Sequence, residues 1–76
     1  MLRKEEGRLS EAIPFFRKAY GLDPDLSAAA WDLAGGLATL GETAEALAIL
    51  ERYRERHPDD AVAAGLERAI RADVAR

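Results

Sequence analysis

The chain repeats part of its own sequence at an offset of 34 residues. The matched positions hold glycine, proline, alanine and acidic residues, the types that set turns and close helix contacts. The identical pairs include Gly7 and Gly41, Glu11 and Glu45, Ala12 and Ala46, Pro24 and Pro58, Asp25 and Asp59, Ala29 and Ala63, and Ala30 and Ala64. Such a period predicts a stack of similar units, none of which buries its apolar side chains alone.

Each unit is predicted to be helical, because Ala, Leu, Arg and Glu predominate and no alternating strand pattern is present. Turn signals divide the chain into five helical segments: 1–6, 10–21, 26–40, 43–56 and 60–75. The short breaks between them force each helix back against the one before. We therefore expect an all-α fold of antiparallel helix-turn-helix repeats with about five helices.

The predicted break at Gly7 depends on how the segment after it begins. Ser10 is a suitable N-cap for a helix over 10–21, since its hydroxyl can accept from a free amide of the first turn. Pro14 then falls in the first turn, where a missing N–H costs little. Ile13, Phe16 and Tyr20 recur at helical spacing and give this helix an apolar stripe.

Size and charge exclude several classes of protein. A chain of 76 residues forms one small domain of marginal stability, and without cysteine it has neither disulfides nor thiolate metal sites. The net charge is −3, and residues 19–51 contain no Lys or Arg. Nucleic-acid binding requires a clustered basic face, so no nucleic-acid partner is expected.

Membrane insertion is also not expected. No stretch approaches the roughly 18 apolar residues of a transmembrane helix, and residues 1–7 contain no apolar signal-peptide core. The predicted location is the cytoplasm.

A helical unit of 34 residues with this pattern resembles the tetratricopeptide repeat, W-x2-L-G-x2-Y, then a turn glycine, then A-x3-F-x2-A-x4-P. The first copy carries the second half of the pattern: Gly7, Ala12, Phe16, Ala19 and Pro24. The second copy is complete: Leu33, Ala34, Leu37, Gly41, Ala46, Leu50, Tyr53 and Pro58. The resemblance implies one domain over 1–76, with a partial first repeat at 1–26, a complete second repeat at 27–60, and a capping helix at 61–76.

The last helix is interpreted as a cap because only one side of it is apolar. Its charged side chains lie elsewhere on the helix: Glu67, Arg68, Arg71 and Arg76. The end of a solenoid needs such a polar outer face to stay soluble.

In tetratricopeptide domains the first helices of successive repeats line a concave groove that binds peptides or partner proteins. The resemblance places five residues of this chain there: Ala28, Trp31, Gly35, Ala38 and Thr39. Trp31 stands one residue after the family's tryptophan, which turns it by about 100° towards the groove. Packing of Trp31 into the core is the alternative. Gly35 and Gly36 favour close helix packing, with an open groove floor as the alternative.

The partner predicted for this groove is a protein or peptide of basic or amphipathic character. A clamp of Lys, Asn and Arg for a peptide carboxylate is absent, because Trp31, Gly35 and Thr39 hold those positions. The acidic middle of the chain suits a basic partner by charge complementarity. The alternative is that Asp32, Glu42 and Glu45 form an ordinary solvated face.

Two functions remain, a protein-interaction module and a structural element that self-assembles by stacking its repeats. The partial first repeat is expected to leave Ile13 and Phe16 partly uncovered. About three repeats are usually needed for stability, so we expect a homodimer in which one chain covers the N-terminal opening of the other.

No enzymatic activity, cofactor or metal is expected. The chain has no nucleophile paired with a base, no glycine-rich phosphate loop and no cluster of metal ligands. His57 is the only histidine, and its place near a predicted helix C-terminus is explained by the helix dipole.

Overall fold

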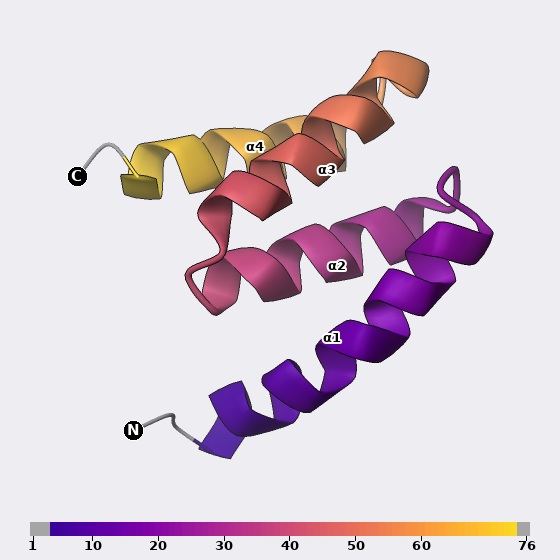
Figure 1. Cartoon of the computed structure of the whole chain (residues 1–76). Helices are drawn as coiled ribbons and strands as arrows, with labels where there is room; N and C mark the ends of the chain where they lie inside the picture. The colour runs from indigo at the N-terminus through magenta and orange to yellow at the C-terminus, as the bar shows by residue number, and fades with distance from the viewer. Residues whose placement is uncertain (1–3, 75–76) are drawn as a thin grey trace.

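The computed structural model describes residues 4–74, which form helices and turns without a strand. The helices are α1 (Lys4–Leu22), α2 (Ser27–Thr39), α3 (Thr43–Arg56) and α4 (Ala61–Val74). Each runs back against the one before it, and α2 contacts all three others (Figure 1). The predicted all-α architecture is confirmed. Parts of the predicted helices at 1–6 and 60–75, and of the predicted cap at 61–76, fall on residues 1–3 and 75–76, outside the described residues.

The prediction of five helices is wrong over the described residues, because α1 continues through Gly7 without a turn. Gly7 does not adopt the left-handed conformation that would have ended a helix there. Glycine permits that conformation but does not require it, and the residues on either side of Gly7 are helical here. Helix formation by these residues therefore prevails over the break.

Ser10 and Pro14 consequently occupy positions different from those predicted. Both lie inside α1, so Ser10 is not an N-cap and Pro14 is not in a first turn. Proline at this position removes the hydrogen bond that its amide would have donated to the Ser10 carbonyl. Both side chains are exposed, so the proline ring is not buried against a neighbouring helix.

Gly41 forms the turn that Gly7 does not. It has a φ of 87° and is the only described residue in the left-handed region. Its amide donates to the Ala38 carbonyl at 3.1 Å, and the Glu42 amide donates to the Leu37 carbonyl at 2.8 Å. This pair of bonds closes the end of α2 in a Schellman motif, which favours glycine because residues with a Cβ rarely adopt the left-handed backbone.

The two proline turns have equivalent backbone hydrogen bonds. The Leu26 amide donates to the Asp23 carbonyl at 3.1 Å, and 34 residues later the Asp60 amide donates to the His57 carbonyl at 3.2 Å. Proline occupies the second position of each turn, where its fixed φ is suited. The turns end α1 and α3, and they direct α2 and α4 back along the stack.

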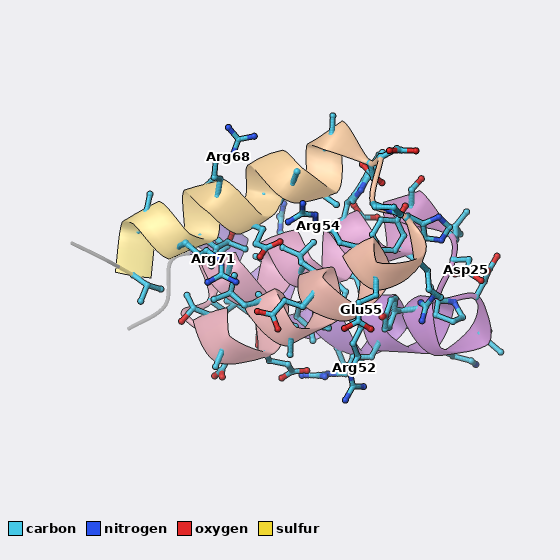
Figure 2. All side chains as sticks on the ribbon, turned by 90° about the horizontal axis from the view of Figure 1, so that it is seen from above. Asp25, Arg52, Arg54, Glu55, Arg68 and Arg71 are labelled. Atoms are coloured by element: carbon cyan, nitrogen blue, oxygen red, sulfur yellow. The ribbon has the colours of Figure 1, made fainter. Side chains whose placement is uncertain are left out.

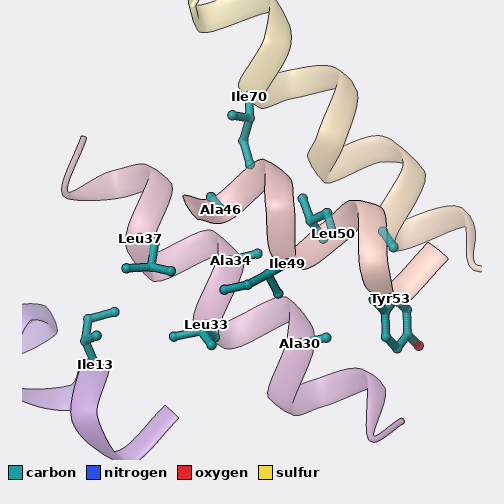
Figure 3. Close-up of a cluster of buried hydrophobic side chains, with 11 residues drawn as sticks. Ile13, Ala30, Leu33, Ala34, Leu37, Ala46, Ile49, Leu50, Tyr53 and Ile70 are labelled. Atoms are coloured by element: carbon teal, nitrogen blue, oxygen red, sulfur yellow. The ribbon is translucent and has the colours of Figure 1, made fainter. Parts of the chain in front are cut away.

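The core lies on both sides of α2 (Figure 3). The largest fully buried side chains are Leu33 and Leu37 of α2 and Leu50 of α3. Ile13 contributes from α1 and Ile70 from α4. The Cα atoms span 37 × 33 × 16 Å, so the helices form a shallow layer in which α2 is the most enclosed.

The expectation that Ile13 is partly uncovered is wrong, since only 8% of its surface is exposed. A Cβ built on Gly36 would lie 2.9 Å from Ile13 Cδ1 and 3.4 Å from Leu9 Cδ1. The missing side chain therefore lets α1 approach α2 and cover Ile13. Phe16 is half-buried beside it and packs against the core.

Candidate binding groove

A cavity of about 430 Å³ opens between α2 and α4. Three of the five predicted groove residues line it: Gly35, Ala38 and Thr39. The facing residues from α4 are Leu66, Ala69, Ile70, Ala72 and Asp73, and Thr43 of α3 also lines the cavity. Most of these side chains are small or apolar, so the cavity can accept apolar groups of a partner.

Gly35 and Gly36 differ in their surroundings although they are adjacent. A Cβ at Gly35 would meet no atom within 4 Å, whereas one at Gly36 would press on Ile13. Gly36 therefore allows close packing of α1 on α2. Gly35 leaves open space at the wall of the cavity. The Thr39 hydroxyl donates to the Gly35 carbonyl at 2.9 Å, so its hydrogen-bonding capacity is met within α2.

Trp31 and Ala28 lie apart from this cavity. Ala28 is exposed at the start of α2, and Trp31 is half-buried against the core. The indole Nε1 donates to Asp60 Oδ2 at 3.2 Å, which ties α2 to the start of α4. Trp31 borders a second depression of about 570 Å³, formed mainly by the 56–62 turn.

Asp60 is the centre of the joint between α3 and α4. Besides the indole, it accepts from the Tyr53 hydroxyl at 2.7 Å and from the Ala63 amide at 3.0 Å, the latter an N-cap bond of α4. These donors, Tyr53 foremost, lower the pKa of the Asp60 carboxyl. Burial, followed by the bond to Asp60, raises the pKa of Tyr53.

His57 is held by structural contacts at the same joint. Its ring stacks on Tyr53 with centroids 4.6 Å apart, and its Nε2 lies 3.0 Å from Asp25 Oδ1. Arg56 Nε donates to the same oxygen at 2.7 Å. The bonds from His57 and Arg56 lower the pKa of Asp25. Within residues 4–74, no three acidic or histidine side chains are grouped to hold a metal ion.

A family model described as a tetratricopeptide repeat matches residues 4–70. The chain belongs to the tetratricopeptide repeat family. Repeats of this family generally mediate protein–protein interaction and are typically non-catalytic. No curated protein and no solved structure matches the chain. None of the described helices is long and apolar enough to cross a bilayer.

The α4 wall of the groove was not predicted from the sequence, although the tetratricopeptide repeat explains it. Ala69, Ala72 and Asp73 stand 34 residues after Gly35, Ala38 and Thr39. Both sets line the same cavity, so α4 presents to the groove the positions that α2 does. Carrying the 34-residue offset one helix further would have identified them.

The side of α4 away from α2 is charged. Glu67 is 8% exposed and accepts from Arg54 Nη1 of α3 and, at 2.8 Å, from Arg71 Nη2. Arg71 also reaches Glu51 on α3 at 3.0 Å. Figure 2 shows Arg54 between the two helices and Arg68 pointing away from them. The two arginine bonds, that of Arg54 first, lower the pKa of Glu67.

Proposed function

We propose that this tetratricopeptide domain binds a peptide or a segment of a partner protein in the groove between α2 and α4. The observation that carries the proposal is the cavity between the two helices, lined from both sides by equivalent repeat positions. Its volume of about 430 Å³ is within the usual range of ligand sites, roughly 300–1,000 Å³, and admits one or two apolar side chains.

The charges around the groove favour a basic or amphipathic partner. Asp32 is the one charged residue of α2, it is exposed, and the cavity wall includes Asp73 of α4. A short helix with apolar residues at i, i+3 and i+4 and with lysines beside them would place the apolar groups in the cavity. The lysines would then lie near the two carboxylates, which gives selectivity over acidic peptides.

The proposal is tested by selecting a binder from a displayed library of peptides about twelve residues long, roughly 18 Å as a helix. We expect the selected peptides to combine basic residues with an apolar i, i+3, i+4 pattern. Ala69→Arg should fill the cavity, repel a basic peptide and weaken its binding at least about tenfold. Fluorescence anisotropy with a labelled peptide measures this.

Ala48→Arg is the matched control, because Ala48 is exposed on α3 and does not line the cavity. It should leave the affinity unchanged. Equal loss of binding in both variants, or none in Ala69→Arg, would show that the peptide binds elsewhere.

We also propose that α4 caps the stack. Leu33 and Leu37 of α2 are buried, and they belong to the same core cluster as the buried residues of α3. The equivalent residues of α4 are Glu67 and Arg71, which pair with each other. A following helix would have to bury these charges, which is costly unless the pairing remains complete.

A further inference from the structure

The outer side of α1 carries exposed apolar side chains. Phe15 is 73% exposed and Leu22 is 78% exposed, with exposed Ala19 between them. Spacings of four and three residues place the three on one side of the helix. Together they are called the α1 face below. It lies on a different part of α1 from Ile13, which is buried against α2.

The internal repeat shows what a face of this kind contacts. Phe15 is equivalent to Ile49, and Ala19 is equivalent to Tyr53. In α3 these side chains are 9% and 3% exposed, and Figure 3 shows Ile49 directed at α2. The α1 face thus has the position of a helix-covered face, and no described helix covers it. Leu22 extends the α1 face, and its equivalent in the second copy is the exposed Arg56.

The covering helix is not supplied by α4 of another copy. The residues of α2 in the core beside α3 include Ala30, Leu33, Ala34 and Leu37, and their equivalents in α4 are Ala64, Glu67, Arg68 and Arg71. Docking α1 on that surface would desolvate the ion pairs of Glu67 with Arg54 and Arg71. Head-to-tail stacking of copies is therefore disfavoured.

The α1 face is complementary to itself when two copies are antiparallel. Glu11 lies one turn before Phe15, and Lys18 lies about one turn after it, both exposed. A two-fold axis near Phe15 brings Glu11 of each copy beside Lys18 of the other. Glu45, the equivalent of Glu11, likewise pairs with a basic side chain from another helix, Arg17.

We propose that two copies of this chain dock through their α1 faces, antiparallel, around a two-fold axis near Phe15. The contact pairs Phe15 with Phe15 and Glu11 with Lys18, and it closes, so assembly stops at two. With one helix from each chain, the interface falls below about 1,200 Å² and forms a weak, concentration-dependent dimer. The groove between α2 and α4 stays accessible in both copies.

Sedimentation equilibrium from about 1 µM to about 1 mM, a range that covers weak association, tests the proposal. We expect the wild-type mass to rise from monomer to dimer and to stop there. Phe15→Glu should remain monomeric, because it places two carboxylates at the axis. Val62→Glu makes the same change at an apolar residue that is 50% exposed outside α1, and it should still dimerise.

A charge exchange keeps the test decisive if Phe15→Glu fails to fold. Glu11→Lys alone should weaken the dimer several-fold by placing like charges together, and Glu11→Lys combined with Lys18→Glu should restore it. A wild-type chain that stays monomeric, a mass that grows past two, or a double variant as weak as the single one would overturn the proposal. Peptide binding by the monomeric Phe15→Glu variant reports on the groove separately.

Discussion

The two ends of the helix stack present opposite surfaces although they are built on the same repeat. At the α1 end, Phe15 and Leu22 are largely exposed. At the α4 end, Glu67 is enclosed by arginines from two helices. A 34-residue period fixes the direction of each helix but does not decide what its outer side carries. The α1 end can accept another helix, and the α4 end accepts one only at the cost of desolvating paired charges.

The largest expected effect comes from making the α4 end resemble the interior of the stack. Glu67→Leu combined with Arg71→Leu introduces the residues that α2 has at the equivalent positions, Leu33 and Leu37. An apolar receiving surface should then accept the α1 face of another copy, so that assembly no longer closes at two. Light scattering should show a mass that grows with concentration.

The control for this variant removes the same charges elsewhere. Arg52→Leu combined with Glu55→Leu changes two exposed residues of α3 and should not produce growing assemblies. If the Glu67 and Arg71 variant has the wild-type mass, these charges are not what prevents another copy from docking on α4.

The next effect separates the two sides of α1. Ile13→Ala should lower the free energy of unfolding by about 2–4 kcal/mol, because it leaves a void between α1 and α2. Phe15→Ala should change it by no more than about 0.5 kcal/mol in the dilute monomer, since the side chain already contacts water. Urea unfolding at the lowest workable concentration measures both. Similar losses would mean that the α1 face is packed within one chain.

The smallest effect concerns the pH dependence of the α4 end. The arginine bonds lower the folded-state pKa of Glu67, so the carboxylate stabilises the fold above its unfolded pKa, near 4.5. That contribution is lost as the pH falls through the lower folded-state value. Glu67→Gln should cost about 1 kcal/mol at neutral pH, a modest figure because both arginines reach solvent. The loss of stability on acidification should also become shallower.

Glu55→Gln is the matched control, because Glu55 is an exposed glutamate of α3. Thermal unfolding between neutral and acidic pH should give the same profile as wild type. A Glu67→Gln profile parallel to that of wild type would contradict the assigned pKa shift.

The proline turns could be predicted from the sequence, whereas the glycine turns could not be predicted equally well. Pro24 and Pro58 each follow an Asp or His and precede an Asp, and this turn composition, together with their fixed φ, marks the end of a helix. Pro14 lacks that context and lies inside α1. Gly41 and Gly7 are equivalent by sequence, yet only Gly41 is left-handed. Glycine permits that conformation but does not require it. What decides is whether the two flanking segments can pack together, as α2 and α3 do.

The groove was predicted from α2 alone, and its other wall depended on contacts across the fold. Gly35 and Gly36 are adjacent glycines that the sequence pattern does not distinguish. They differ because Ile13 packs against Gly36 and not against Gly35. The indole bond of Trp31 likewise requires Asp60, which lies 29 residues further along the chain. Periodicity within one helix gives the side that a residue occupies, but it does not identify the neighbour that reaches that side.

The indole bond between Trp31 and Asp60 gives the protein a built-in optical probe. Trp31 is the only tryptophan, and its environment depends on the first turn of α4 remaining in place. Its emission therefore follows the detachment of α4, whereas far-ultraviolet circular dichroism averages over every helix. If the α1 end loosens first, the dichroic signal will fall before the fluorescence shifts. The interval between the two midpoints then reports how strongly the two ends of the stack are coupled.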